Sequence, residues 1–293
     1  MNAIEVQGLS KSYKNSGFSL NNVSFTVPSG AITGFVGENG SGKTTTIGCI
    51  LNTLIKDSGT IKVFGEEMTD AGTHLREDIG VVFDGNSFSE YLTAAKISSA
   101  MKHIYLRWDA NLFKEYLSKF NLPLKENIKS FSRGMKMKLG IAVALSHHPR
   151  LLILDEATAG LDPVIRKDIL DILLDFVGDE KHSVLLSSHI TSDLERVADY
   201  IAFIHAGKII LSEKKDDLIY NYGIMRCTAA QFDEIAPEDI LAFRKQDYQI
   251  NVLIADRQAA YKQYKDIVID NATIEEAMLL LIRGKRNEEK KPD

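Results

Sequence analysis

One segment constrains the fold more than any other: Gly37-Glu38-Asn39-Gly40-Ser41-Gly42-Lys43-Thr44-Thr45. It follows an apolar run that predicts a buried strand, and it precedes residues 46–51, which predict the start of a helix. A strand, a loop of the form G-x-x-x-x-G-K-[ST] and a helix, in this order, are typical of a phosphate-binding loop. Glycines let the backbone approach phosphates closely, and the N–H groups at the helix start bind anions. The motif predicts that Lys43 reaches the β- and γ-phosphates and that the Thr44 hydroxyl binds Mg²⁺.

Composition limits the class of protein. The 293 residues are enough for about two domains. A hydrophobic share of 44% and a charged share of 26% fit a globular chain, and the net charge of −5 gives no sign of a nucleic-acid partner. The two cysteines, Cys49 and Cys227, are too few for a disulfide framework, which favours a reduced, cytosolic protein with both thiols packed as small apolar groups.

The membrane signals are weak. The start of the chain, Met1-Asn-Ala-Ile-Glu-Val, is already strand-like and acidic, so no signal peptide is expected. No stretch approaches the roughly 20 apolar residues that cross a bilayer. We therefore expect a chain that does not span a membrane, while docking onto a membrane partner stays open.

Strand and helix patterns alternate along the first two thirds of the chain. Strands are expected at 4–9, 20–27, 61–64 and 80–83. Helical periodicity then dominates, with helices expected at 91–102, 112–120 and 135–145. This pattern indicates a helical insert, about residues 87–148, within an α/β domain.

Two acids follow the apolar run 151–154: Asp155 and Glu156. Because ligands of parallel α/β sheets bind at the carboxyl ends of strands, Asp155 is a candidate second Mg²⁺ ligand and Glu156 a candidate to orient or deprotonate water. Solvated acids at a plain strand-to-loop transition are the alternative. His189 follows the next predicted strand, 183–187, in the same way, and is a candidate polar contact to phosphate. The pair His147 and His148 lacks such a context, and we expect both on the surface.

The pattern of predicted strands and helices changes near residue 220. Short strand candidates alternate with short helices, and residues 273–282 predict an amphipathic helix with Thr273 as N-cap and Glu276 in the capping-box position. We expect three regions: a nucleotide-binding domain over 1–219, a small α+β domain of ferredoxin-like type over 220–284, and a disordered tail over 285–293.

Four motifs in order carry a family resemblance: the phosphate loop, the segment Ser130-Phe-Ser-Arg-Gly-Met-Lys136, the pair 155–156 with Ala159-Gly-Leu-Asp-Pro163 after it, and Ser187-Ser-His189. Over about residues 3–220 the chain resembles the ATP-binding subunits of ABC transporters. The second motif is similar to the family signature L-S-G-G-Q. The resemblance implies a P-loop NTPase fold, with a RecA-like α/β core, an antiparallel β subdomain and a helical insert.

The resemblance also implies a role for each matching residue. ATP would be bound by the Walker A residues Gly37, Glu38, Asn39, Gly40, Ser41, Gly42, Lys43, Thr44 and Thr45, with Tyr13 stacked on adenine. Asp155 would be the Walker B aspartate, Glu156 the catalytic glutamate and His189 the switch histidine that senses the γ-phosphate. The signature residues Ser132, Arg133, Gly134 and Met135 would face ATP held by a partner subunit, and Asp162 would contact that subunit. For Tyr13, the residues alone favour a plain surface tyrosine over stacking.

The chain departs from the family pattern at three places. Arg133 replaces a glycine of the signature, and Ala157 stands where proline is common. Asp84 occupies the position of a glutamine that reaches Mg²⁺ and the membrane partner. A carboxylate there suits Mg²⁺ or a water, but a helix-capping or turn role is equally open.

The resemblance implies an ATPase motor that uses ATP and Mg²⁺. Two subunits, identical or different, would close on ATP and reopen on hydrolysis, driving a separate polytopic permease at the cytoplasmic face of the cell membrane. The nearest group is the exporter-type subunits of Gram-positive bacteria that handle lantibiotics, bacitracin or toxin peptides. Two alternatives remain: a soluble ABC-type ATPase that acts in translation or DNA repair, and a nucleotide-sensing module without turnover.

Overall fold

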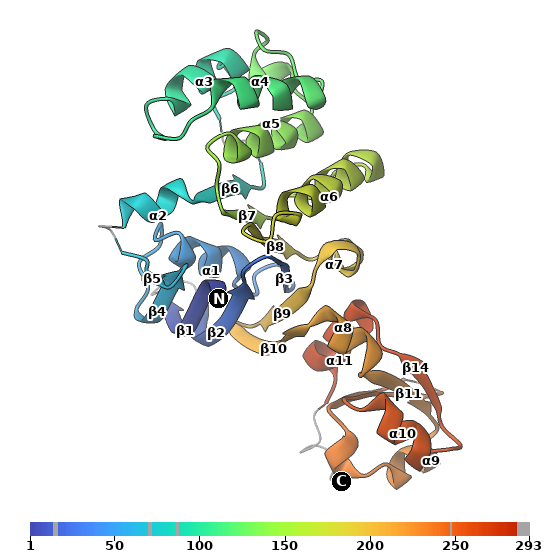
Figure 1. Cartoon of the computed structure of the whole chain (residues 1–293). Helices are drawn as coiled ribbons and strands as arrows, with labels where there is room; N and C mark the ends of the chain where they lie inside the picture. Colours follow the sequence, from blue (N-terminus) through green and yellow to red (C-terminus); the bar gives the residue numbers. More distant parts are fainter. Residues whose placement is uncertain (14–16, 70–71, 86–87, 247, 286–293) are drawn as a thin grey trace. The chain divides into compact units, whose positions relative to one another are not determined.

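The computed structural model describes residues 1–13, 17–69, 72–85, 88–246 and 248–285. It divides into two compact units, Met1–Ile209 and Ile210–Asp293 (Figure 1). The boundary precedes the one expected after residue 219, and strand β10 (Lys208–Lys214) runs across it. The expected tail lies outside the described residues from 286 onward, whereas Lys285 pairs with Phe243 in a short antiparallel bridge.

The first unit contains two sheets with helices around them. Its strands are β1 (Asn2–Ser12), β2 (Ser19–Pro28), β3 (Ile32–Val36), β4 (Ser58–Val63), β5 (Glu66–Glu67), β6 (Ile79–Phe83), β7 (Leu151–Asp155), β8 (Ser183–Ser188), β9 (Tyr200–His205) and the start of β10. Its helices are α1 (Lys43–Ile50), α2 (Thr73–Glu77), α3 (Ala94–Met101), α4 (Ala110–Lys119), the 3₁₀ turn η1 (Ile128–Ser130), α5 (Arg133–Leu145), α6 (Pro163–Val177) and α7 (Thr191–Val197).

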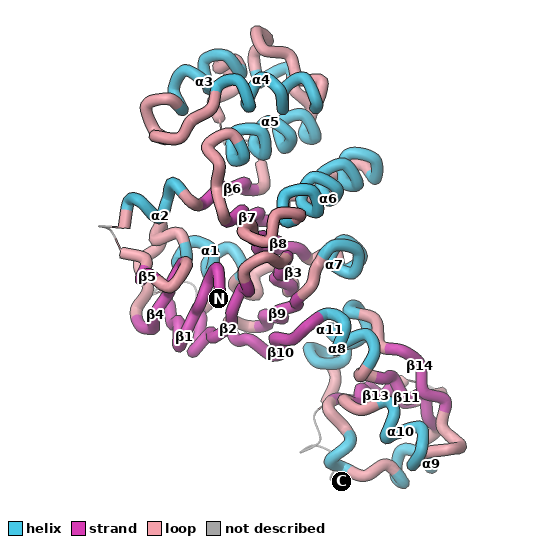
Figure 2. Tube along the Cα trace, in the orientation of Figure 1, coloured by secondary structure: helices cyan, strands magenta, loops and turns pink. Residues whose placement is uncertain are grey.

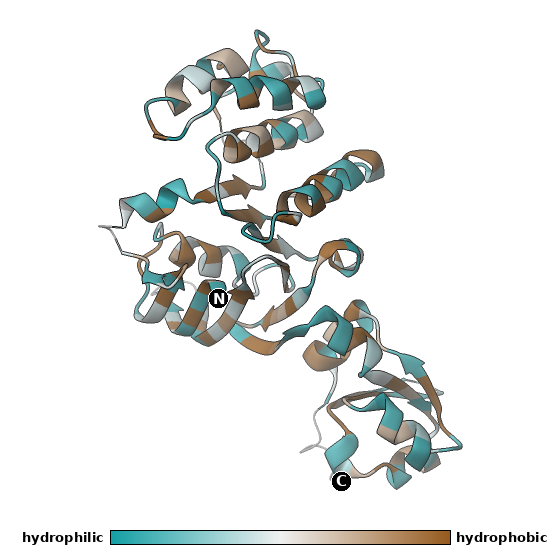
Figure 3. Ribbon diagram, in the orientation of Figure 1, coloured by the Kyte–Doolittle hydropathy of each residue, from teal (hydrophilic) through white to brown (hydrophobic). Residues whose placement is uncertain are grey.

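The central sheet has the strand order β10-β9-β3-β8-β7-β6, and β9, β3, β8, β7 and β6 run parallel. Strands β3, β7 and β8 are buried along their whole length, as parallel strands covered on both faces must be. Figure 3 shows these strands as largely hydrophobic. The apolar runs of the sequence therefore form the inner strands β3, β8 and β7 of the sheet.

The register of the central sheet brings three strand ends together. Asp155 at the end of β7 lies beside Phe83 of β6 on one side and beside Ser187 of β8 on the other. Ser187 in turn lies opposite Phe35, near the end of β3. The loops that leave β3, β7 and β8 therefore start from one edge of the sheet, where parallel sheets bind ligands.

A second, antiparallel sheet has the order β2-β1-β4-β5. Buried and exposed residues alternate along β2, as expected for a sheet with one face against the core. The stacked rings of Phe25 and Phe35, with centroids 5.0 Å apart, connect this sheet to the central one. The two sheets share one core, which includes Cys49 as a free, buried thiol.

The helical insert consists of α3, α4, η1 and α5, and α5 packs on β6 (Figure 2). Helix α3 begins at residue 94 rather than 91, because the Thr93 hydroxyl accepts a hydrogen bond from the Lys96 amide at 3.3 Å and caps it. Asp109 caps α4 in the same way, and Ser132 caps α5. Both helices start two residues before the periodicity indicated, because the N-cap fixes the start.

The expected exposure of His147 was wrong. Its side chain is fully buried, its ring stacks on Tyr105 with centroids 3.9 Å apart, and its Nδ1 lies 3.2 Å from the Glu77 carbonyl oxygen. Burial lowers the pKa of the His147 imidazole. The neighbouring His148 is exposed, as expected, so the polar pair split between the interior and the surface.

The second unit contains the end of β10, then α8 (Lys215–Tyr220), β11 (Gly223–Cys227), α9 (Ala229–Glu234), η2 (Pro237–Asp239), β12 (Ala242–Lys245), β13 (Ile250–Ile254), α10 (Arg257–Gln263), β14 (Val268–Asn271) and α11 (Ile274–Arg283). Its sheet has the order β12-β13-β11-β14, with antiparallel neighbours. From β11 to β14 the element order β-α-β-β-α-β is that of the ferredoxin-like arrangement expected. Thr273 caps α11 by accepting from the Glu276 amide and donating to its carboxylate, which confirms the predicted cap.

Candidate functional site

The glycine-rich loop connects β3 to α1. Gly42 has φ +115 and lies directly before α1, a conformation that other residues rarely adopt. A Cβ at Gly37 would collide with the carbonyl oxygen of Ile204. The Lys43 ammonium donates to the carbonyl oxygens of Gly37 at 2.7 Å and Glu38 at 3.2 Å, so the loop wraps around its own lysine. The predicted loop conformation is therefore present.

Two hard oxygen donors meet beside this loop. The Thr44 hydroxyl donates to Asp155 Oδ2 at 2.8 Å, and the Ser187 hydroxyl donates to Asp155 Oδ1 at 2.7 Å. Asp155 is buried, so its orientation is fixed by these two bonds. A hydroxyl and a carboxylate side by side fit Mg²⁺, which takes few protein ligands and fills the rest of its shell with water and phosphate oxygens. Among the described residues, no group of three or more His, Cys, Asp and Glu could hold a metal alone.

The Glu156 carboxylate lies between the Lys43 ammonium and the His189 imidazole. Its Oε1 is 3.0 Å from Lys43 Nζ, and its Oε2 is 2.7 Å from His189 Nδ1. The side chain is only 15% exposed. Its backbone has φ +54, which is uncommon for a residue with a side chain and is typical of functional positions. The structure thus brings the ends of β7 and β8 together over the phosphate loop, as the sequence predicted.

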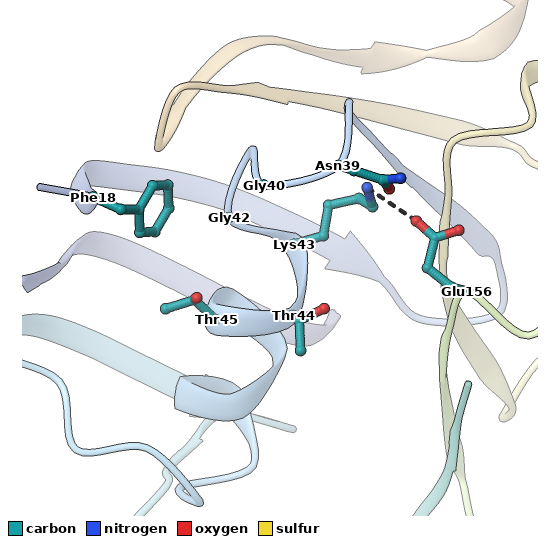
Figure 4. Close-up of a pocket in the computed structure, with 8 residues that line it drawn as sticks. All are labelled: Phe18, Asn39, Gly40, Gly42, Lys43, Thr44, Thr45 and Glu156. Carbon is teal, nitrogen blue, oxygen red and sulfur yellow. Dashed lines mark ion pairs between the residues drawn. The ribbon is translucent and has the colours of Figure 1, made fainter. Parts of the chain in front are cut away.

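Figure 4 shows a pocket beside the phosphate loop, with Lys43 and Glu156 in its lining. It has a volume of about 300 Å³ and is lined by Phe18, Asn39, Gly40, Gly42, Lys43, Thr44, Thr45 and Glu156. We call the residues Gly37–Thr45, Asp155, Glu156 and His189 the phosphate-loop half of the site. The Lys43 ammonium and the N–H groups at the start of α1 suit an anion.

Sequence reasoning missed one lining residue, Phe18. Its ring lies against the loop, and a Cβ at Gly42 would come within 3.0 Å of its Cζ. The expected adenine contact, Tyr13, is 36% exposed, has Lys11 Nζ at 5.6 Å from its ring centroid, and is not among the described lining residues of the pocket. Phe18 directly precedes β2, and nothing in its sequence position indicated this approach to the loop.

The signature segment, residues 132–135, lies elsewhere. Ser132 caps α5 by accepting from the Met135 amide at 3.2 Å, and Gly134 leaves room for Ile165, whose Cγ2 would lie 3.1 Å from a Cβ there. Ser132 and Arg133 are exposed. Among the described residues that line the phosphate-loop pocket, none comes from the signature segment.

Two further candidates have local partners. Asp162 caps α6 by accepting from the amides of Val164 at 3.1 Å and Ile165 at 3.0 Å. Asp84, directly after β6, accepts from the Arg133 guanidinium at 2.7 Å. The sequence had left Mg²⁺ contact, capping and a turn open for Asp84, and had not considered a pair with Arg133.

Asp193 of α7 is a second residue that the sequence did not single out. It is buried, and burial raises the pKa of its carboxyl, while the charge of Arg166 acts in the opposite direction. Arg166 Nη1 lies 4.0 Å from Asp193 Oδ1. This contact ties α7, which follows His189, to α6.

Comparison with known proteins places this site in a family. Residues 20–159 match the family described as ABC transporter. The bacitracin transport ATP-binding protein BcrA of Bacillus licheniformis is 36% identical over 71% of this chain and 68% of its own length. The chain belongs to the ABC transporter family. It is an ATP-binding subunit of this family and an ATPase.

Other relatives agree with this membership. The lantibiotic transport ATP-binding protein SrtF of Streptococcus pyogenes is 36% identical over 73% of this chain and 91% of its own length. A solved ATP-binding subunit of an ABC transporter is 28% identical and superposes with a TM-score of 0.65 over 74% of this chain and 91% of that one. A dimeric ATP-binding cassette bound to ADP and Pi shares the fold, with a TM-score of 0.65 over 72% of this chain and 98% of that one, at 21% identity.

The family match spans the phosphate loop, the signature segment and Glu156, and it ends before His189. The relatives named above are, by their names, ATP-binding proteins of transport systems. In this chain, no helix in the described residues combines the length and the apolar character that crossing a bilayer needs.

Proposed function

We propose that this chain is the ATP-hydrolysing motor subunit of a peptide exporter. ATP binding closes a sandwich of two such subunits, hydrolysis reopens it, and the movement drives a separate membrane permease. The observation that carries the proposal is the position of Glu156, held between Lys43 and His189 beside the Thr44–Asp155 pair. The proposed base Glu156, the phosphate-binding Lys43 and the proposed Mg²⁺-binding pair Thr44–Asp155 therefore lie next to one another.

The nucleotide phosphates would lie along the loop Gly37–Thr45. Lys43 forms an ion pair with Glu156 and donates to two backbone carbonyls. A phosphate that reaches Lys43 competes with the Glu156 carboxylate for the same ammonium and displaces it. Glu156 then becomes available to accept a proton from water, while His189 remains beside it.

Mg²⁺ would be held by Thr44 and Asp155, whose oxygens are already within 2.8 Å of each other. When bound, the ion neutralises charge on the phosphate oxygens. Asp155 itself is oriented by the Ser187 hydroxyl, so the carboxylate needs little rearrangement to accept the ion. Positioning and charge neutralisation are most of what phosphoryl transfer requires.

The second half of each site would come from a second subunit, identical or different. Ser132 and Gly134 would bind the γ-phosphate held by the partner subunit's loop, with Met135 beside them, and Asp162 would face that subunit. The exposure of Ser132 and its separation from the phosphate-loop pocket support this arrangement. An aromatic ring, Tyr13 or the pocket-lining Phe18, would stack on adenine.

The peptide-export assignment rests on relatives. Their names attach two of them to bacitracin and lantibiotic transport. By this similarity the chain would dock at the cytoplasmic face of the membrane through a polytopic permease and serve export of a peptide or amphipathic toxin. Co-purification with a polytopic membrane protein would support this, whereas co-purification with ribosomes would support a soluble ATPase.

The decisive test replaces the proposed base. Glu156→Gln keeps the size of the side chain and removes its basicity, so we expect ATP to bind while hydrolysis falls by about a hundredfold or more. ATP binding is measured by equilibrium titration and hydrolysis by phosphate release, in the chain with its partners. Glu90→Gln, an exposed acid paired with Lys136, is the matched control. Hydrolysis by Glu156→Gln at the parent rate would exclude Glu156 as the base.

A further inference from the structure

Two of the positions that depart from the family pattern contact each other. Arg133 Nη2 donates to Asp84 Oδ1 at 2.7 Å, although the two residues are 49 apart in the chain. Both side chains are about half exposed, 50% for Arg133 and 46% for Asp84. Nothing in the local sequence of either residue predicts this pair. The arginine in place of a signature glycine and the aspartate in place of a glutamine form one ion pair.

A third segment completes this contact. The Arg133 guanidinium lies directly against Gly160, where a Cβ would be 2.5 Å from Nη1 and 3.0 Å from Cζ. Gly160 has φ +65, so its backbone also favours glycine. One guanidinium is therefore placed between the carboxylate of Asp84 and the backbone of Gly160.

Each of these three segments leads to a part of the proposed site. Asp84 directly follows Phe83, which lies in register beside Asp155. Arg133 lies between Ser132 and Gly134. Gly160 lies in the loop from Glu156 to Asp162, whose start is fixed by the Ala159 amide donating to the Glu156 carbonyl at 3.1 Å.

We infer that Arg133 is a positioning residue that holds the loop after β6, the signature segment and the loop after Glu156 in one arrangement, through its contacts with Asp84 and Gly160. The inference rests on the proposed function, because it concerns the rate of ATP hydrolysis. Arg133 and Asp84 act as a pair, so removal of either side chain is expected to have the same effect as removal of both. Movement of the strand end beside Asp155 then reaches the segment that closes the partner subunit's site.

The chemistry of arginine suits this role better than a stabilising one. A half-exposed ion pair contributes little to folding stability, because solvent screens it. The guanidinium, however, is planar and offers a fork of donors, so Nη2 bonds to Asp84 while Nη1 lies against Gly160. Lysine carries the same charge but has no planar group, so Arg133→Lys preserves the charge and loses the geometry.

The experiment is a set of double-mutant cycles in which kcat and KM for ATP are measured on the full chain with its partners. We expect Arg133→Ala to lower kcat for ATP about tenfold with KM within twofold, because it displaces groups that act in the transition state. Arg133→Lys recovers less than half of the loss. Asp84→Ala lowers kcat by a similar factor, and the double variant is no slower than Arg133→Ala alone. Gly160→Ala slows the parent more than it slows Arg133→Ala, since the guanidinium clash is then absent.

The matched control is Lys136→Ala. Lys136 lies one turn further along α5 and pairs with Glu90 at 3.1 Å, an ion pair that is also partly exposed. We expect its kcat to stay within twofold of the parent. Amide hydrogen exchange of the nucleotide-free chain supplies a readout that needs no hydrolysis: Arg133→Ala accelerates exchange at Met135 and Ala159 about threefold or more, and Lys136→Ala does not.

Three results would overturn the inference: an unchanged kcat in Asp84→Ala, multiplicative losses in the double variant, or unchanged exchange in Arg133→Ala. Multiplicative losses would place Arg133 directly on the partner subunit's phosphate. Failure of the proposed function is separate, because it shows as absent hydrolysis in the parent or full hydrolysis in Glu156→Gln. The exchange measurement then decides the inference alone.

Discussion

The phosphate-loop half and the signature segment are organised in opposite ways. In the first, Lys43 and Glu156 are mostly buried and form an ion pair, and the buried Asp155 accepts from the Thr44 hydroxyl. In the second, Ser132 and Arg133 are exposed, and Ser132 bonds only within its own helix start among the contacts described. Groups that must be preorganised for chemistry are fixed by their own chain. Ser132, which we propose is offered to a second chain, is held at a helix start and has an exposed side chain.

The largest expected effect that sharpens this comparison is at Ser132. Ser132→Ala should lower hydrolysis about tenfold and leave ATP binding to the phosphate-loop half unchanged, because one charge-assisted contact to phosphate is lost in the closed dimer. Hydrolysis and nucleotide affinity are measured separately. The substitution also uncaps α5, which costs about 1 kcal/mol of stability.

The control for capping is Thr93→Ala, which uncaps α3 in the same manner. It should lower the melting temperature by a similar amount and leave hydrolysis near the parent value. If Ser132→Ala and Thr93→Ala hydrolyse ATP equally well, Ser132 is only a helix cap, and the two halves do not differ as described.

A smaller effect is expected at the aromatic wall of the pocket. Phe18→Leu preserves apolar packing and removes the flat ring face, so we expect ATP affinity to fall about fivefold, the low end of base stacking at about 1 kcal/mol. Tyr13→Leu should change affinity less, because Tyr13 is not among the described lining residues. Titration with ATP and with inorganic triphosphate separates base from phosphate binding. The reverse ranking would assign stacking to Tyr13.

The smallest effect concerns stability of the helical insert. Burial holds the pKa of His147 below its ordinary value, so the folded state binds fewer protons than the unfolded one. The stability that neutral His147 contributes is present above its ordinary pKa of about 6.5 and is lost as the pH falls through that value. Wild-type protein should therefore lose thermal stability between pH 7.5 and 5.5, and His147→Gln should lose less. The exposed His148→Gln serves as control and should behave like the wild type.

Local motifs explain why much of the site was predictable. The phosphate loop, Asp155 and Glu156 each follow a short apolar strand, and the sheet register then brings them together without further information. Phe18 was missed because it reaches the pocket across a chain connection, and sequence spacing carries no signal of that approach. The prediction that His147 is exposed was wrong because its ring stacks on Tyr105 and its Nδ1 contacts the Glu77 carbonyl, and both partners are distant in the sequence.

Contacts between distant segments were the least predictable. The Asp84–Arg133 pair joins a strand end to a helix start, and both residues stood out in the sequence only as separate departures. The second unit shows the opposite case, since its short strands and the cap of α11 followed from local patterns. Periodicity and capping are properties of neighbours in the chain, whereas an ion pair across the fold is not.

The register of β7 sets a limit on how this chain can change. Asp155 faces the Thr44 hydroxyl only because an odd number of residues separates it from Leu151, which lies in register with Ile79 on one side and Ser183 on the other. Loss or gain of one residue within the strand would turn the carboxylate to the opposite face of the sheet. The four apolar side chains before it can exchange among Leu, Ile and Val. Mutation can thus vary the composition of this strand but not its length.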